Sequence, residues 1–276
     1  MRAMNACGKL PFSDPGVKHS PACPTFGAHH HRNPSSRMIL TDKVMVVTGA
    51  SAGLGARFSA DLVARGARVY GLARREDRLR ELESELGPAF TGLVCDVTDE
   101  PQVASAFATI METSGRVDAL INNAGLGKFG PADEVTAEEW DLQMNVNLRG
   151  VFLCTRAVLP VMKHQNQESG FGGHVVNIAS VAGLMGNPNI STYNVTKYGL
   201  RGYSDALFKE VRQDGIKVSC LFPGSIQTEF FDVAGIPISA NPMEAEDVSS
   251  TLIHILETPD NYLISEIVMR PLRPKG

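Results

Sequence analysis

Along most of the chain, short apolar runs alternate with longer segments whose apolar residues recur every three or four positions. The run Lys43–Thr48 (KVMVVT) is rich in β-branched residues, which is typical of a buried strand. The next segment, Leu54–Arg65, has the period of an amphipathic helix. Six further runs predict strands at Val69–Ala73, Thr91–Cys95, Val117–Ile121, His174–Ile178, Lys217–Leu221 and Tyr262–Met269. Further helices are predicted at Arg75–Leu86, Thr98–Thr113, Glu138–Lys163, Thr192–Gln213 and Glu246–Leu256.

Two local signals refine these helices. Thr98 begins the third predicted helix and Pro101 falls in its first turn, so Thr98 is the predicted N-cap. The long segment Glu138–Lys163 contains Pro160, which lacks a backbone N–H. We therefore expect that helix to be disturbed near Pro160.

The alternation of strands and helices predicts an α/β fold. Strands that are apolar throughout are typical of a parallel sheet covered on both faces, and right-handed crossovers make such a sheet open and doubly wound. We expect one Rossmann-like domain over residues 38–276, with about seven parallel strands and helices on both faces. Such sheets bind ligands at the carboxyl ends of their strands, so the residues there are the candidates for a site.

Residues 1–37 differ from the rest of the chain. They contain five prolines, three glycines and the run His29–His31, without a sustained period of 2 or 3.6. We expect a disordered N-terminal extension. Its five basic residues and one acid faintly resemble a targeting peptide, but the prolines argue against an amphipathic helix. A translation start at Met38 is the favoured interpretation.

Composition and charge argue against several classes of protein. A net charge of −4 and a pI of about 6.0 argue against a nucleic-acid-binding face, and no apolar stretch reaches the ~18 residues that would cross a membrane. The five cysteines form no C-x-x-C pair, so reduced thiols and a cytoplasmic location are expected. The adjacent histidines of the extension lack the spacing of metal ligands, and no metal site is predicted.

The first predicted strand ends in a glycine-rich turn, TGASAGLG at residues 48–55. Glycines let backbone N–H groups and the N-terminus of the following helix approach a pyrophosphate. The turn is therefore a candidate phosphate-binding site, although a glycine-rich turn without function would have the same local sequence. The residues concerned are Gly49, Ser51, Gly53, Leu54 and Gly55.

The second predicted strand ends at Ala73, which is followed by Arg74 and Arg75. An NAD site needs an acid near this position to hold the ribose 2′-hydroxyl, and alanine cannot do that. A guanidinium suits a 2′-phosphate, so the pair predicts NADP(H) in preference to NAD(H). The alternative is that both arginines are solvated at the start of a helix.

The next two strand ends leave alternatives open. Asp96, followed by Val97, could accept a hydrogen bond from an adenine amino group or stabilise the next helix N-terminus. Asn123, followed by Ala124 and Gly125, could contact a ligand or hold its own loop rigid.

Tyr193 and Lys197 lie four residues apart in a predicted helix and therefore project from one face. The spacing alone does not distinguish acid–base chemistry from an ordinary amphipathic turn. Lowering a tyrosine pKa from about 10 to about 7 takes about 4 kcal/mol. A cation ~4 Å away, at an effective dielectric constant of ~20, supplies about 4 kcal/mol. Lys197 is therefore expected to lower the pKa of Tyr193.

An ordered set of motifs carries a resemblance to a known family. The motifs are TGASAGLG (48–55), DV (96–97), NNAG (122–125), NVNLRG (145–150), NIAS (177–180), YNVTK (193–197) and PGSIQT (223–228). Over about residues 41–270 the chain resembles the short-chain dehydrogenases/reductases, in the branch with T-G-x-x-x-G-x-G and Y-x-x-x-K motifs. Single motifs are weak, but the ordered set is specific.

The resemblance implies roles for individual residues. Tyr193 is implied as the proton donor or acceptor, Lys197 as the residue that holds the nicotinamide ribose, and Ser180 as a hydrogen-bond partner of the substrate oxygen. Asn147 is implied to hold a water that links Lys197 to solvent. Implied cofactor contacts are Gly49, Gly53 and Gly55 at the pyrophosphate, Asp96 at the adenine, Asn123 beside the cofactor, and Pro223, Gly224 and Thr228 at the nicotinamide end.

The resemblance also implies an NADP(H)-dependent oxidoreductase that transfers a hydride between nicotinamide and a carbonyl or secondary alcohol. The expected pocket walls at 126–129, 184–189 and 229–243 are mainly apolar and predict a small apolar substrate. A 3-oxoacyl-thioester reductase is one alternative. A non-catalytic NADP-binding protein is another, disfavoured because the acid–base residues are all present. A homodimer or homotetramer is expected, through the helices predicted at 138–163 and 192–213.

Overall fold

The computed structural model describes residues 39–229 and 240–274. The predicted N-terminal extension and residues 230–239 of the expected substrate loop lie outside this range. The strands are β1 (Val44–Thr48), β2 (Arg68–Ala73), β3 (Phe90–Val94), β4 (Ala119–Asn122), β5 (Gly173–Ile178), β6 (Ile216–Pro223) and β7 (Glu266–Met269). The helices are α1 (Gly53–Ala64), α2 (Glu76–Leu86), α3 (Glu100–Ser114), α4 (Ala137–Met144), α5 (Gly150–Ser169), α6 (Ser191–Val211) and α8 (Ala245–Leu256).

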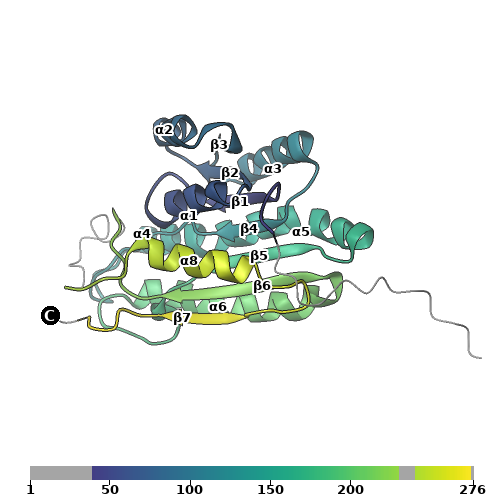
Figure 1. Cartoon of the computed structure of the whole chain (residues 1–276). Helices are drawn as coiled ribbons and strands as arrows, with labels where there is room; N and C mark the ends of the chain where they lie inside the picture. Colours follow the sequence, from purple (N-terminus) through teal and green to yellow (C-terminus); the bar gives the residue numbers. More distant parts are fainter. Residues whose placement is uncertain (1–38, 230–239, 275–276) are drawn as a thin grey trace, which may run out of the picture. The chain divides into compact units, whose positions relative to one another are not determined.

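The strands form one parallel, seven-stranded sheet in the order β3-β2-β1-β4-β5-β6-β7 (Figure 1). The chain adds strands outward from β1 in one direction and from β4 in the other, so the topological switch point lies between these two strands. This arrangement confirms the predicted Rossmann-like, doubly wound sheet. The glycine-rich turn after β1 and the Asn-Asn-Ala-Gly segment after β4 therefore meet at the switch point.

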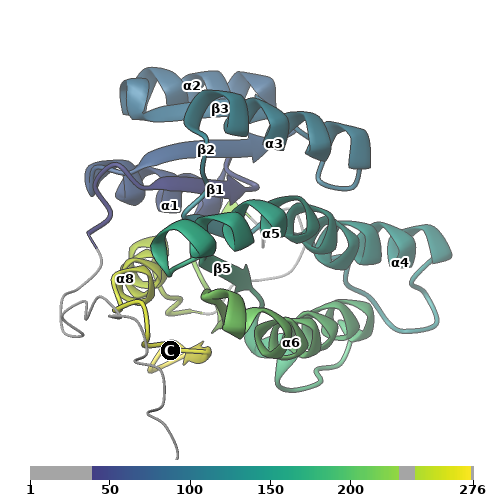
Figure 2. The same cartoon turned by 90° about the vertical axis from the view of Figure 1, so that its right-hand side faces the viewer.

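Helices cover both faces of the sheet. One apolar core contains residues of α1, α2 and α8 against the central strands, and a second contains residues of α3, α5 and α6. Figure 2 shows α1 and α8 on one side of the sheet and α5 and α6 on the other. The two central cores explain why β1, β5 and β6 are buried along their whole length, as their apolar sequences predicted.

The helix predicted at 138–163 is irregular at a different place from the one expected. It passes through Pro160 within α5 without a break, so the predicted disturbance there is wrong. The interruption is a π-helical turn at Asn145–Arg149, between α4 and α5. Such turns insert one residue into a helix and occur frequently at functional sites. Asn147 lies inside this turn.

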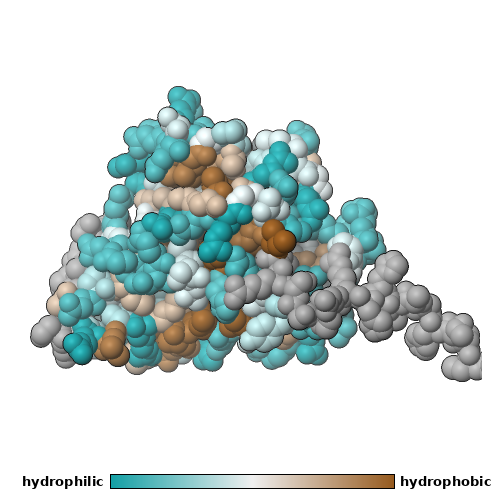
Figure 3. All heavy atoms as spheres, in the orientation of Figure 1, coloured by the Kyte–Doolittle hydropathy of each residue, from teal (hydrophilic) through white to brown (hydrophobic). Residues whose placement is uncertain are grey.

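Two smaller predictions are also corrected. The N-cap of α3 is Asp99, whose carboxylate accepts from the backbone N–H of Gln102, and Thr98 lies one residue before it. The last strand spans only Glu266–Met269 and begins four residues after the predicted start at Tyr262. This short strand is an edge of the sheet, and Figure 3 shows apolar residues gathered along that edge.

The described residues agree with the expected state of the thiols. Cys95, Cys154 and Cys220 are free and buried.

Within the described ranges, no helix is long and apolar enough to cross a membrane, and no group of three or more His, Cys, Asp or Glu side chains could hold a metal ion.

Candidate active site

The glycine-rich turn after β1 is packed too tightly for larger residues. Gly49 has φ +68°, and a Cβ there would lie 2.9 Å from the Cα of Ala124. A Cβ on Gly55 would lie 2.2 Å from the carbonyl oxygen of Gly49. The N-cap of α1, Ala52, offers no side-chain cap to the first N–H groups of the helix. The turn therefore leaves a helix N-terminus open to an anion, as a pyrophosphate site requires.

The segment after β4 is tied to this turn by hydrogen bonds. The hydroxyl of Thr48 accepts from the backbone N–H groups of Asn123 and Ala124, both at 3.0 Å. The Asn123 amide donates back to the carbonyl of Thr48 at 3.0 Å. Of the two roles left open for Asn123, the structure shows the one that holds the loop rigid. Thr48 was not predicted as a site residue. Its side chain joins the two segments that meet at the switch point.

The two arginines after β2 lie in different surroundings. Arg75 donates from Nε to the hydroxyl of Ser51 at 3.2 Å and from Nη2 to the Ser51 carbonyl at 3.3 Å. Arg74 is exposed, and among the described residues it has no hydrogen-bond or ion-pair partner. The Arg75 guanidinium thus lies beside the glycine-rich turn, and Arg74 directly follows β2, where a 2′-phosphate is expected.

Asp96 is engaged locally. Its Oδ1 accepts from the backbone N–H of Thr98 at 2.9 Å and from the Thr98 hydroxyl at 2.8 Å. This is the stabilising role before a helix that the sequence left open, while the adenine contact stays a prediction. The neighbouring Val97 is buried, and a Cβ on Gly150 would lie 2.7 Å from its side chain.

Asn147 holds the loop that follows β4. Its Oδ1 accepts from the backbone N–H of Leu126 at 2.9 Å, and its Nδ2 donates to the Leu126 carbonyl at 2.8 Å. Its Nδ2 also reaches the hydroxyl of Thr196 at 3.1 Å. A Cβ on Gly125 would lie 3.4 Å from Oδ1 of Asn147 and 3.7 Å from Nζ of Lys197, so the two side chains flank the same glycine.

Ser180, Tyr193 and Lys197 come together at the carboxyl end of β5. Ser180 follows the strand, and its hydroxyl accepts from the backbone N–H of Ala182 at 3.2 Å. A side-chain hydrogen bond joins Ser180 to Tyr193, which is buried in the first turn of α6. Lys197 lies one turn along α6 with its Nζ 5.6 Å from the centre of the Tyr193 ring. That Nζ donates to the carbonyl of Ile178 at 2.9 Å.

The pKa of Tyr193 differs in sign from the expectation. Burial raises it to about 12, and the hydrogen bond with Ser180 opposes this only in part. Burial also lowers the pKa of Lys197 to about 8. Desolvation thus disfavours both charged forms. The expected lowering of the Tyr193 pKa by Lys197 is not found, because the phenol is surrounded by protein and its anion would lose its hydration.

Phe129 provides an apolar wall beside Tyr193. Its ring meets that of Tyr193 edge-on, with centroids 5.4 Å apart and planes at 88°.

The Gln143 side chain of α4 accepts from the backbone N–H of Lys128 at 3.1 Å. Gln143 is fully buried, and its Nε2 has no hydrogen-bond partner among the described residues. Gln143 lies four residues before Asn147, about one helical turn away. This spacing is the one signal in the sequence that could have identified it as a second residue holding the loop.

Asn194 is a second residue that the sequence did not single out. Its Nδ2 donates to the carbonyl oxygens of Ala182 and Met185, at 2.6 and 2.8 Å, and its Oδ1 accepts from the N–H of Asn187 at 3.2 Å. It therefore ties part of the predicted wall 184–189 to α6, directly beside Tyr193.

The segment after β6 contacts both β7 and the glycine-rich turn. The Gly224 N–H donates to the carbonyl of Met269 at 2.8 Å, which fixes the Pro223–Gly224 turn against β7. A Cβ on Gly53 would lie 3.5 Å from the Thr228 side chain, so Thr228 stands over the glycine-rich turn. Contacts of these residues with nicotinamide stay a prediction.

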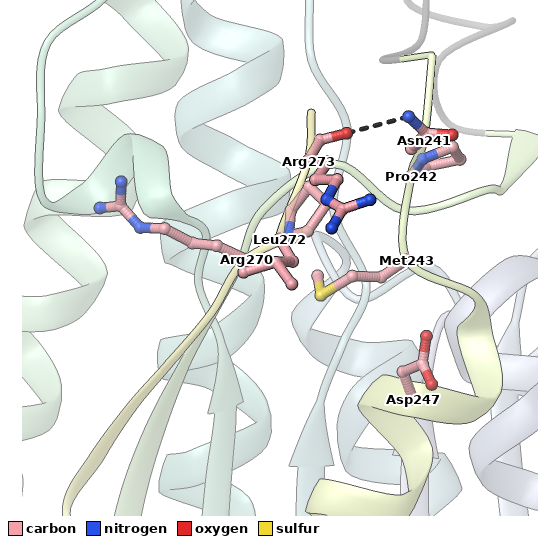
Figure 4. A pocket seen from close by; sticks show the side chains of 8 residues that line it. Asn241, Pro242, Met243, Asp247, Arg270, Leu272 and Arg273 are labelled. Carbon is pink, nitrogen blue, oxygen red and sulfur yellow. Dashed lines mark hydrogen bonds between the residues drawn. The ribbon is translucent and has the colours of Figure 1, made fainter. Parts of the chain in front are cut away.

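A hollow of about 620 Å³ lies between the start of α8 and the residues after β7 (Figure 4). The Asn241 amide donates to the Arg273 carbonyl at 3.0 Å, and the Arg270 side chain points away from the other labelled residues. Asn241, Pro242 and Met243 belong to the expected pocket wall 229–243, and none of the other residues lining this hollow is a predicted site residue. Pro271 borders it and also lies beside Gly224.

These groups fit a nicotinamide dinucleotide. An uncapped helix N-terminus and tight glycines suit the pyrophosphate, and the arginines suit a 2′-phosphate. No acid stands at the end of β2 to repel that phosphate, because the position is Ala73. Residues able to hold the cofactor are thus present from the adenosine end to Lys197.

Comparison with known proteins agrees with this geometry. The family model described as short chain dehydrogenase matches residues 43–235. The chain is 30% identical to an uncharacterized oxidoreductase of Staphylococcus aureus over 85% of its length and 99% of the relative's. It is 32% identical to dehydrogenase/reductase SDR family member 11 of Gallus gallus, over 84% of this chain and 96% of that one.

Solved structures are similar over nearly their whole length. A 3-ketoacyl-(acyl-carrier-protein) reductase from Brucella melitensis complexed with NADH superposes with a TM-score of 0.78 at 27% identity, over 83% of this chain and 97% of that one. A metagenomic short-chain oxidoreductase in complex with NADP has a TM-score of 0.73 at 32% identity, over 85% and 99%.

Proposed function

We propose that this chain, which belongs to the short-chain dehydrogenase family, is an NADP(H)-dependent oxidoreductase acting on carbonyl groups or secondary alcohols. Its membership makes it an oxidoreductase with a nicotinamide cofactor. The observation that carries the finer proposal is the Ser180–Tyr193 hydrogen bond with Lys197 one turn away, at the carboxyl end of β5.

The proposed chemistry divides between cofactor and protein. A bound nicotinamide supplies or accepts the hydride. In the reducing direction, Tyr193 gives its phenolic proton to the substrate oxygen as negative charge develops there, and Ser180 donates a hydrogen bond to the same oxygen. In the reverse direction, the Tyr193 phenolate takes the alcohol proton.

The raised pKa of Tyr193 suits the donor role. With a pKa of about 12, the side chain is a neutral phenol at pH 7 and holds the proton that reduction consumes. Oxidation needs the phenolate, and positive charge near the ring favours that form. Lys197 supplies such charge while protonated, and Asn147 is proposed to link it to solvent through water.

NADP(H) is the proposed cofactor because β2 ends in Ala73 and not in an acid, and two arginines follow it directly. We assign the 2′-phosphate to Arg74 and Arg75 with Ser51, and the adenine to Asp96 and Val97. The remaining proposed contacts are Gly49, Gly53, Leu54 and Gly55 at the pyrophosphate, Asn123, Ala124 and Gly125 beside the cofactor, and Pro223, Gly224 and Thr228 with Tyr193 and Lys197 at the nicotinamide end.

The proposed substrate is a small apolar ketone, aldehyde or secondary alcohol. Support comes from Phe129 packed on Tyr193 and from Met185, whose carbonyl is tied to Asn194, the neighbour of Tyr193 in α6. Reduction of a 3-oxoacyl thioester is a second candidate, favoured by the similarity to the Brucella reductase. Assay of a 3-oxoacyl carrier-protein thioester beside simple ketones separates the two.

We further propose a homo-oligomer in a reducing, cytoplasmic setting. Its support is the exposure of large apolar side chains on α4, α5 and α6, namely Trp140, Leu142, Phe152, Val195 and Tyr198, and the three buried free thiols.

Titration with NADPH and NADH, followed by a panel of carbonyl substrates, tests the proposal. We expect tighter binding of NADPH and its oxidation with at least one apolar carbonyl. Cofactor binding without turnover on any compound would instead favour the non-catalytic alternative.

A further inference from the structure

Arg75 has protein groups near all three guanidinium nitrogens. Nε and Nη2 donate to the hydroxyl and the carbonyl of Ser51. Nη1 faces the carboxylate of Glu229, with Oε2 at 3.6 Å. Glu229 follows β6 by six residues, so this ion pair joins the glycine-rich turn after β1 to the segment after β6.

A second contact supports the position of Glu229. The neighbouring Thr228 side chain lies 3.5 Å from the place where a Cβ on Gly53 would stand. The side chain of the residue before Glu229 therefore lies beside the turn that the pyrophosphate is proposed to occupy. The Glu229 carboxylate thus lies beside Arg75, and the residue before it is placed against the glycine-rich turn.

A 2′-phosphate and the Glu229 carboxylate would compete for the same donor. Both are oxygen anions that a guanidinium binds through parallel N–H groups. A phosphate monoester carries a charge of about −1.5 to −2 at pH 7, so a carboxylate on the neighbouring nitrogen repels it as well. NADH has no 2′-phosphate and meets neither effect. Arg74, without a partner among the described residues, is free of this competition.

We propose that Glu229 is a cofactor-specificity residue that tempers the preference for NADP(H) by competing with the 2′-phosphate for Arg75. The inference rests on the proposed NADP(H) site. It goes beyond that site because it concerns one acid that no sequence motif marks. It assigns the two arginines different tasks: Arg74 binds the phosphate directly, and Arg75 is shared between the phosphate and Glu229.

The test compares Glu229→Gln with the wild type in direct binding of NADPH and of NADH, followed by cofactor fluorescence at low ionic strength. The substitution keeps the shape and removes the charge. An exposed ion pair supports an expected change of about two- to fivefold. We expect NADPH to bind that much more tightly and NADH to be unaffected. In about 1 M salt, where charges are screened beyond ~3 Å, the difference should largely vanish.

Glu246→Gln is the matched control. Glu246 is another exposed acid paired with an arginine, Arg57 of α1, and its loss changes the net charge equally. It should leave both dissociation constants unchanged. In an Arg75→Ala background, Glu229→Gln should tighten NADPH less than it does in the wild type, because the shared donor is absent and only direct repulsion by the carboxylate is removed.

The outcomes separate this inference from the function on which it rests. A wild type that prefers NADPH, with Glu229→Gln unchanged or weaker in NADPH binding, overturns the inference alone. A wild type without that preference, and an Arg74→Ala variant equal to it, overturns the NADP(H) proposal and this inference together. Equal tightening of NADPH and NADH by Glu229→Gln also overturns the inference.

Discussion

The ring of Phe129 stands edge-on to the ring of Tyr193, 5.4 Å away between centroids. The contact is one part of the burial of the phenol, and burial disfavours the anion because it removes hydration. The backbone beside Phe129 is in turn held by Gln143, through the N–H of Lys128. Helix α4 therefore holds the loop that carries the ring packed on Tyr193.

Replacement of Phe129 by alanine should lower the pKa of Tyr193. Burial raises that pKa to about 12, and water admitted beside the ring moves it toward the ordinary value of about 10. Alcohol oxidation needs the phenolate, so its rate increases with pH through this pKa. The rising limb of the pH–rate profile should shift to lower pH by about one unit. Phe208→Ala, at a partly buried position toward the far end of α6 from Tyr193, is the control and should leave the profile in place.

Tyr193→Phe should remove catalysis but spare cofactor binding. The variant loses the proton donor, a contribution of about 10²–10⁴ in rate for general acid–base catalysis, and keeps the ring and its packing. We expect kcat to fall by at least about a hundredfold and the dissociation constant of NADPH to stay within about twofold. Tyr198→Phe, an exposed tyrosine on the same helix, is the control. Near-normal kcat in Tyr193→Phe would remove Tyr193 from the proposed mechanism.

Lys197 should make stability depend on pH in a defined window. Its pKa is about 8 in the folded chain because burial disfavours the ammonium, against about 10.4 when unfolded. Between these values the unfolded state binds more protons, so the contribution of Lys197 to the free energy of unfolding increases with pH. Below pH 8 the full cost of the buried charge is present.

Lys197→Met removes this titration. The free energy of unfolding of the wild type, relative to the variant, should increase by about 1–3 kcal/mol from pH 8 to pH 10. Urea denaturation at each pH measures it. Lys209→Met, at an exposed position paired with Asp205, is the control and should run parallel to the wild type. If the difference in the free energy of unfolding between the wild type and Lys197→Met does not change with pH, the lowered pKa of Lys197 is contradicted.

Arg74→Ala should weaken NADPH selectively. A hydrogen bond to a charged group contributes about 1.5–3 kcal/mol, so the dissociation constant of NADPH should increase by about 10- to 100-fold while that of NADH hardly changes. Arg68→Ala is the control, because Arg68 is exposed at the opposite end of β2. Unchanged selectivity in Arg74→Ala would exclude Arg74 from phosphate binding.

Phe152→Glu should disrupt the proposed oligomer. Phe152 lies on α5 and is 44% exposed, which is costly for a large apolar side chain without a partner surface. Light scattering should show a smaller assembly for Phe152→Glu than for the wild type. The activity per folded chain is measured on the same samples. Val94→Glu, at the end of β3 and away from the long helices, serves as control. Equal masses for Phe152→Glu and the wild type would place any interface elsewhere.

The sequence predicted the sheet well because its strands are buried on both faces and read as continuous apolar runs. The residues at the switch point followed from that, since parallel strands bring their carboxyl ends together. The N-cap of α3 was misplaced by one residue because Thr98 and Asp99 are both good caps. Choosing between them depends on backbone geometry that the sequence does not give.

Other features depend on contacts between distant segments. Spacing placed Tyr193 and Lys197 on one face but gave no measure of burial, and burial decided the sign of the Tyr193 pKa shift. The pairing of Arg75 with Glu229 joins residues more than 150 positions apart, and neither stands in a motif that marks the pair. The π-helical turn was missed because a count of apolar positions cannot detect a single inserted residue.

That inserted residue has a consequence for how the chain can vary. Each residue turns a helix by about 100°, so the turn at Asn145–Arg149 sets α5 at a different rotation from a regular extension of α4. Deleting one residue there would restore an unbroken α-helix and leave every strand in place. It would also rotate Gln143 relative to the body of α5 and break the joint hold of Gln143 and Asn147 on the loop at 126–128. In this stretch, the length of the chain is under as strong a constraint as its side chains.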